Sequence, residues 1–298
     1  MKIYLAIIAT FFAASQLFAK FDYVETMKKA QAGDPVAQNA VGEYFADGGE
    51  GDFPPDYVRA IVWWDLAARN GNARGLTNLG AAYYMGNGYK RNIPKAIELW
   101  SEASKRGDSE AQYLLGLAYA NGLGVLPDVN TAVFWWDKSA QQGNSRAQCN
   151  LAFAYARGQG VEHKDSKKAF ELWKASAEQG NLVAQTNMGL CYFTGEGVEP
   201  DRAKAVAIWT NASEFGNAEA RKYLAIAYAT GNGITKDIPK AIALFQSAGA
   251  AGDADAAKMA EQLRIANANV DFTKTAMPSV SNAKPDNADK KTSKPAKK

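Results

Sequence analysis

The sequence predicts an all-α solenoid, a right-handed α/α superhelix of stacked helix pairs, and two regularities of its glycines carry this prediction. A Gly followed by Asp or Asn recurs at intervals of 36 to 38 residues, at Gly33, Gly71, Gly107, Gly143, Gly180, Gly216 and Gly252. Inside the intervals a Gly-x-Gly turn recurs as well, beginning at Gly86, Gly122, Gly158, Gly195 and Gly231. The first interval contains the longer turn Gly48-Gly49-Glu50-Gly51. Repetition at this period is typical of helix-pair repeats, which bury their apolar faces only by stacking.

The polar residues around these glycines predict where each helix begins and ends. Gly accepts the left-handed conformation at a helix end, and the Asp or Asn after it can cap the next helix. A second column of capping residues precedes the other helix of each unit, at Asp56, Asn92, Asp128, Asp165, Asp201 and Asp237. We therefore expect six units over residues 33–251. Each unit should contain two helices of about 12–14 residues.

The apolar columns predict how these helices pack. In the first helix, Ala111, Leu115-Gly116 and Tyr119 lie on one face, and later units repeat this pattern. The Gly should let a neighbouring helix approach closely. The second helix carries an aromatic residue seven positions before its terminal Gly, at Trp64, Trp100, Trp136, Trp173, Trp209 and Phe245. An aromatic column this regular indicates core packing.

The N-terminal residues 1–19 have the pattern of a cleaved secretory signal peptide. A Lys at position 2 precedes an apolar run from Ile3 to Phe12, which is too short to span a bilayer, and small residues follow up to Ala19. Cleavage after Ala19 would leave a periplasmic or secreted protein. The alternative is an uncleaved N-terminal anchor.

The remaining segments flank the repeats. Residues 20–32 are expected to form an N-terminal capping helix and residues 252–266 a C-terminal capping helix. Residues 267–298 have few large apolar side chains and should form a disordered, Lys-rich tail.

The charge of the chain is unevenly distributed. The net charge is +3, but residues 277–298 alone contribute six Lys and two Asp. With Lys2 also set apart, residues 20–276 carry a net charge of −2, which disfavours binding to nucleic acid. The tail could make a weak, salt-sensitive contact with an anionic envelope surface, or it could serve only as a solubilising extension.

The search for catalytic and metal-binding residues finds no candidate. The chain has one His, His163, and no nucleophile elbow, zinc-protease motif or phosphate-binding loop. We therefore expect no catalytic activity, no metal and no cofactor. Cys149 and Cys191 are too far apart along the expected helices for a disulfide, so both should be free thiols, with Cys149 the more reactive if it is exposed.

The unit from Ala111 to Asn144 resembles the Sel-one-like repeat (SLR), a relative of the tetratricopeptide repeat. The resemblance covers residues 33–266 and implies a monomeric scaffold that assembles protein complexes in bacterial envelopes, in signalling or in host interaction. A cysteine-rich branch of the family is associated with β-lactam binding and hydrolysis, but the Cys pair of that branch is missing from these repeats. A β-lactam hydrolase therefore remains an alternative, as does a cell-wall glycan binder that uses Trp63 and Trp135 as stacking platforms.

By analogy with tetratricopeptide repeats, a protein or peptide ligand would lie in a concave groove lined by the first helices. The groove positions are the third, sixth, tenth, thirteenth and fourteenth residues after each terminal Gly. They select Tyr84, Tyr113, Leu117, Asn121, Arg146, Phe153, Arg157, Leu190, Phe193 and Ile226. The tenth position forms an apolar stripe from Leu117 to Ile226. In the alternative interpretation, this stripe is buried between adjacent first helices.

Overall fold

The computed structural model describes residues 22–49 and 54–265. The predicted signal peptide and the predicted Lys-rich tail lie outside the described residues. Within them the chain forms fourteen α-helices and divides into two compact units, Met1–Leu115 and Gly116–Lys298, with the boundary inside helix α7 (Ser109–Asn121). The predicted all-α solenoid of helix pairs is confirmed.

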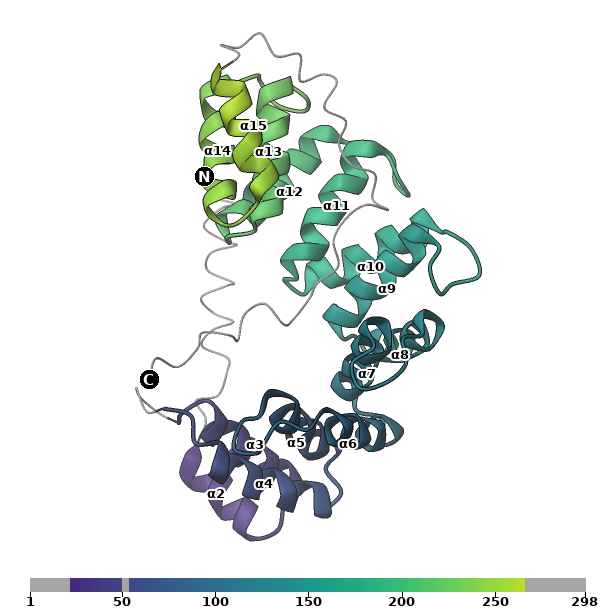
Figure 1. Ribbon diagram of the computed structural model, residues 1–298, viewed down its shortest axis with the longest axis vertical. Coiled ribbons are helices and arrows are strands. Elements are labelled where there is room, and N and C mark those ends of the chain that lie inside the picture. The colour runs from purple at the N-terminus through teal and green to yellow at the C-terminus, as the bar shows by residue number, and fades with distance from the viewer. Residues whose placement is uncertain (1–21, 50–53, 266–298) are drawn as a thin grey trace. The chain divides into compact units, whose positions relative to one another are not determined.

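Both units are built from helices that pack on their neighbours in sequence (Figure 1). The first unit contains α2 (Tyr23–Gln31), α3 (Pro35–Ala46), α4 (Tyr57–Arg69), α5 (Ala73–Met85) and α6 (Ile93–Lys105). The second contains α8 (Val129–Gln141), α9 (Ser145–Arg157), α10 (Ser166–Glu178), α11 (Leu182–Thr194), α12 (Arg202–Glu214), α13 (Ala218–Thr230), α14 (Ile238–Ala250) and α15 (Ala254–Ile265). The repeat helices have 12 or 13 residues, as the sequence predicts.

The predicted capping residues begin the helices. Asp34 Oδ1 accepts hydrogen bonds from the backbone N–H of Val36 and Ala37, at 2.8 and 3.0 Å, at the start of α3. All six residues of the second capping column act as N-caps for α4, α6, α8, α10, α12 and α14. Gly71 ends its repeat with a φ of 94°, a conformation that favours Gly over any residue with a Cβ.

In four repeats the Gly of the first helix provides the space for the Trp of the second helix in the same repeat. A Cβ built on Gly189 would lie 2.5 Å from Trp209 Nε1, and Gly80 and Gly116 are placed in the same way against Trp100 and Trp136. Trp209 is fully buried. The close approach that the sequence predicts is therefore made by an indole ring lying on a bare backbone.

A column of amide side chains, which the sequence analysis did not identify, closes the C-terminal ends of the second helices. Gln38, Gln112, Gln148 and Gln185 each donate through Nε2 to a carbonyl eight residues earlier, and Arg221 does the same through Nη2. Each of these carbonyls also accepts from the backbone N–H of the terminal Gly, so the side chain adds a second hydrogen bond at the helix end. We call these four Gln and Arg221 the amide column.

Candidate functional site

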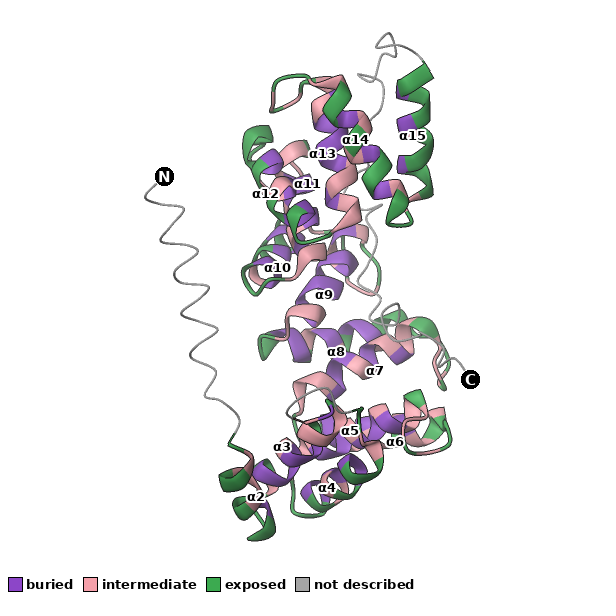
Figure 2. Ribbon diagram, turned by 90° about the vertical axis from the view of Figure 1, so that its left-hand side faces the viewer, coloured by how far each residue is buried: buried purple, intermediate pink, exposed green. Residues whose placement is uncertain are grey.

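Four residues of the predicted groove are part of the core instead. Tyr113 and Leu190 are fully buried, and Phe153 and Ile226 are each 3% exposed. The ring of Phe153 packs edge-on against Trp173 at 5.2 Å, while Leu190 and Ile226 belong to one apolar cluster shared by helices of the second unit. Figure 2 shows α9, which carries Phe153, buried along most of its length. The prediction that these four residues line an open groove is therefore wrong at all four positions.

The alternative interpretation of the apolar stripe describes the second unit correctly. Side chains at the tenth position pack between the first helices of consecutive repeats. Small residues beside them in the sequence, such as Ala225 and Ala227, allow these helices to approach closely. Leu117, in α7, is only half-buried.

The other predicted groove residues are at least partly accessible, but they are not gathered into one site. Tyr84 lies in the first unit, whereas Asn121, Arg146, Arg157 and Phe193 lie in the second. Asn121 is exposed and donates to the carbonyl of Leu117 at 3.0 Å, so it closes the end of its own helix.

Tyr84 and Phe193 occupy equivalent positions and have equivalent surroundings. Each ring is half-buried against the core Trp of its own repeat, with centroids 5.6 and 5.4 Å apart. The guanidinium carbons of Arg91 and Arg202 lie 5.4 Å from the respective ring centroids. Arg157 makes a similar contact with Phe153 at 5.3 Å, and burial lowers the pKa of its guanidinium. These rings and cations pair with one another within the chain.

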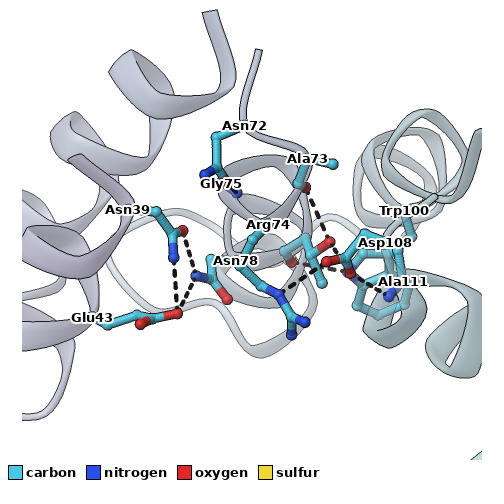
Figure 3. A network of polar contacts seen from close by, with 11 residues as sticks. Asn39, Glu43, Asn72, Ala73, Arg74, Gly75, Asn78, Trp100, Asp108 and Ala111 are labelled. Atoms are coloured by element: carbon cyan, nitrogen blue, oxygen red, sulfur yellow. Dashed lines mark hydrogen bonds and ion pairs between the residues drawn. The ribbon is translucent and has the colours of Figure 1, made fainter. Parts of the chain in front are cut away.

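The first unit carries a row of polar side chains along α3 and α5, in which Asn39 is 7% exposed and the others are more accessible (Figure 3). Asn39 Nδ2 donates to Glu43 Oε1 at 3.0 Å within α3. Across the repeats, Asn78 Nδ2 donates to Asn39 Oδ1 at 3.0 Å and to Glu43 Oε1 at 3.3 Å. Arg74, one turn before Asn78 on α5, binds Asp108 Oδ2 through Nε at 2.9 Å. We call Asn39, Glu43, Arg74 and Asn78 the polar stripe.

Asp108 anchors one end of the polar stripe. Its Oδ1 accepts from Thr77 Oγ1 at 2.9 Å and from the backbone N–H of Ala111 at 2.8 Å, where it caps α7. Its side chain is 7% exposed, whereas that of Arg74 is 40% exposed. Because Thr77 and the Ala111 amide hold this carboxylate, its ion pair restrains the partly exposed Arg74 side chain.

The second unit repeats this anchor at its C-terminal end. Lys222 Nζ lies 2.7 Å from Asp253 Oδ2, and the backbone amides of Asp255 and Ala256 donate to Asp253 Oδ1. Partial burial acts to raise the pKa of Asp253, but the bonds from Lys222 and the backbone amides outweigh it and hold that pKa below its ordinary value.

None of the four residues of the polar stripe is among the residues that the sequence selected. Asn39, Glu43 and Arg74 do occupy predicted groove positions, the sixth, the tenth and the third, but the apolar residues of the tenth column dominated the choice. Asn78 occupies the seventh position, which the tetratricopeptide analogy leaves out. Asn also occupies the seventh position at Asn150 and Asn187, so this recurrence was a signal available in the sequence.

Both cysteines are buried in the second unit, and no disulfide joins them. Burial raises the pKa of Cys191 to about 12, with the charge of Glu196 adding to the effect.

Among residues 22–49 and 54–265, no three His, Cys, Asp or Glu side chains are placed to hold a metal ion. None of the helices in these ranges is long and apolar enough to cross a membrane.

One family of known repeats matches most of the chain. The profile described as the Sel1 repeat matches residues 35–72, 73–108, 109–144, 145–181, 182–216 and 218–253. These stretches include more than two thirds of the 298 residues. A comparison with curated proteins finds no significant match.

Solved structures with similar folds come from bacteria. The crystal structure of c5321, a protective antigen of uropathogenic Escherichia coli with an SLR fold, is 29% identical to this chain with a TM-score of 0.65. The similarity covers 78% of this chain but only 49% of the antigen, so this chain spans about half of that protein. A Sel1 repeat protein from Oxalobacter formigenes is 28% identical with a TM-score of 0.62, over 72% of this chain and 84% of its own.

Proposed function

Because the chain belongs to the Sel1 repeat family and forms a scaffold of repeated helix pairs, we propose that it is an exported, non-catalytic adaptor that binds a protein partner along the polar stripe. The partner would present an extended peptide segment to α3 and α5 of the first unit. The single observation that carries this proposal is the hydrogen-bonded set of Asn39, Glu43 and Asn78, which joins α3 and α5 across two repeats.

The chemistry of the polar stripe suits a peptide backbone. Asn78 uses its amide N–H groups within the stripe, so its carbonyl oxygen remains available to accept a hydrogen bond from a peptide N–H. The terminal guanidinium nitrogens of Arg74 can donate to a peptide carbonyl or carboxylate, because its Nε alone is used by Asp108. A donor and an acceptor one turn apart on α5 match the alternating donors and acceptors of an extended chain.

The exposed residues beyond Asn78 extend this surface. Ala81 and Met85 follow at intervals of three and four residues, so they lie on the same face of α5 as Arg74 and Asn78. Met85 is 50% exposed, and its flexible, polarisable side chain can adapt to different apolar side chains. Side chains that are already held in place lose less conformational entropy on binding, which favours affinity from a small surface.

Two further observations support export and a binding role. The predicted signal peptide directs the chain to the periplasm or outside the cell, and the similar E. coli protein is described as a protective antigen. The absence of recognisable catalytic motifs in the sequence supports an adaptor over the β-lactam hydrolase alternative.

Photo-crosslinking in the cell of origin tests the proposal. A benzoylphenylalanine placed at Met85 lies next to the polar stripe, on the same face of α5 as Arg74 and Asn78, and one placed at Val62, which is 55% exposed on α4, provides a matched control away from it. We expect one dominant protein adduct from Met85 and not from Val62. The adduct should weaken when Arg74→Ala and Asn78→Ala are combined in a chain with an unchanged circular dichroism spectrum.

Two results would contradict the proposal. Equal adducts from Met85 and Val62 would mean that contact is not confined to the polar stripe. An adduct from Met85 that the paired Arg74 and Asn78 substitutions leave unchanged would mean that the polar side chains take no part in binding.

A further inference from the structure

The amide column obeys a second rule that links neighbouring repeats. In two repeats of the chain, the oxygen of the column Gln accepts a hydrogen bond from the residue that precedes the terminal Gly of the next second helix. Asn70 Nδ2 donates to Gln38 Oε1 at 2.9 Å, and Gln179 Nε2 donates to Gln148 Oε1 at 2.8 Å. The column amide is then satisfied at both its donor and its acceptor.

The rule fails at Gln185. Its Nε2 donates to the carbonyl of Ala177 at 3.3 Å, as the rule requires, but its Oε1 is buried and accepts no hydrogen bond from the described residues. The residue that should donate is Phe215, which has no polar side-chain atom and is 63% exposed. A buried amide oxygen without a hydrogen-bond donor destabilises the folded state, so the Gln185 oxygen lacks one donor N–H group.

An open pocket of about 360 Å³ lies at this position in the second unit. It is lined by Ala177, Glu178, Gln185, Met188, Lys204, Ala207, Ile208 and Asn211. Part of the space exists because Ala207 is small, whereas the equivalent residues of the four preceding second helices are Val62, Glu98, Phe134 and Glu171. Lys204, Ile208, Asn211 and Phe215 follow one face of α12, so Phe215 lies beyond the Asn211 end of the pocket.

The charges at the two ends of the pocket differ. Lys204 lies at one end, where its ammonium group donates to Tyr192 Oη at 2.7 Å and lies 4.1 Å from the Tyr192 ring centroid. Asn211 is seven residues further along α12, about 10 Å at the rise of an α-helix. At that end lie Gln185 and the exposed carboxylate of Glu178, which forms no ion pair within the described part of the chain.

Another repeat of the chain shows that a guanidinium group can replace a missing member of the amide column. In the second repeat, Leu76 replaces the column Gln, and Arg106 of the next second helix donates through Nη1 to the carbonyl of Ala68 at 3.4 Å. Its Nε binds Glu102 Oε1 at 3.0 Å. A guanidinium therefore takes the place of the amide by pairing with a helix-end carbonyl and a neighbouring carboxylate at once.

We propose that the pocket between α10, α11 and α12 binds an arginine side chain of a partner protein. A turn of the Gln185 side chain, which lines the pocket, would let the guanidinium donate to Oε1 and pair with the Glu178 carboxylate, while its aliphatic stem contacts Met188 and Ile208. The exposed ring of Phe215 offers a face for the cation. This site lies on the second unit and does not depend on the polar stripe.

Titration of the full chain with N-acetyl-arginine N-methylamide tests the proposal. The Met188 methyl group lines the pocket and gives one of the chain's six methionine signals in a ¹³C-methyl NMR spectrum, assigned by its loss in Met188→Leu. We expect a saturable shift of this signal. The neutral citrulline analogue should bind about tenfold more weakly and the norleucine analogue should not bind, since a hydrogen bond to a charged group is worth about one to two orders of magnitude in affinity.

Two variants separate this site from a general effect of arginine. Phe215→Gln places an amide donor where Gln179 stands in the preceding repeat, so it should satisfy Gln185 within the chain, abolish the shift and leave the melting temperature at or above that of the natural chain. Phe134→Gln removes another exposed ring of the same unit and should leave the shift unchanged. The proposal is overturned if Met188 does not respond, if norleucine shifts it equally, or if Phe215→Gln binds as the natural chain does.

Discussion

The burial of the tenth-position stripe makes Leu190→Ala strongly destabilising. Leu190 is fully buried in the cluster that it shares with Ile226 and Tyr223. The substitution removes the equivalent of about three methylene groups, worth about 2.4 kcal/mol at about 0.8 kcal/mol each, and leaves a cavity. Since the surrounding helices relax only partly, we expect a total loss of about 3 kcal/mol, within the range of about 2–5 kcal/mol for buried Leu.

Leu117→Ala is the matched control, because Leu117 occupies the same column but is only half-buried. Its loss should be about half as large. Urea unfolding followed by circular dichroism at 222 nm measures both values, and the slopes should match that of the natural chain. A loss below about 1 kcal/mol for Leu190→Ala, or a larger loss for Leu117→Ala, would refute the argument and restore the open groove.

Three other predictions follow from the packing and the charges. Gly80→Ala should cost about 1–3 kcal/mol, because the new Cβ overlaps the Trp100 indole; a rise in melting temperature, as the better helix propensity of Ala alone would give, would contradict this. Asp253→Asn keeps the helix cap but loses the charge paired with Lys222, and should cost about 1 kcal/mol at pH 7. Because the folded pKa of Asp253 is lowered, its contribution is present above about pH 4 and lost as the pH falls through the folded value, so the natural chain and the Asn variant should converge in stability once the pH is below that value. Finally, the buried cysteines, with the pKa of Cys191 raised to about 12, should not react with a thiol reagent at pH 8 until urea unfolds the chain; rapid labelling of the native protein would show that one thiol is accessible.

The two proposals place partner contacts on two different parts of the scaffold. The first lies on α3 and α5, and the second lies between α10, α11 and α12. Repeat scaffolds vary the exposed residues of one unit without disturbing the next, because each repeat contacts only its neighbours. The loss of the column donor at Phe215 is an example, since the neighbouring Gln148–Gln179 pair is intact.

Much of the architecture could be predicted from the sequence alone, because it is local and repeated. The Gly-Asp and Gly-Asn pairs place the helix ends, and the second capping column places the other helix of each unit, as the caps of α4 and α6 confirm. The sequence also predicts close helix packing at the Gly and a buried Trp column, whereas the contact between the two was shown only by the structure. Each of these features depends on residues within one period, and six periods repeat the same signal.

The identity of the surface residues was decided by tertiary structure. Phe153 and Leu190 have the hydrophobicity expected of either a groove or a core, and periodicity alone cannot separate the two. The packing of successive first helices buries them, whereas the same face in the first unit leaves Arg74 and Asn78 accessible. The distinction arises because burial depends on how closely a neighbouring repeat approaches. That approach is set by side chains more than thirty residues away in the chain, as the bond from Asn78 to Asn39 illustrates.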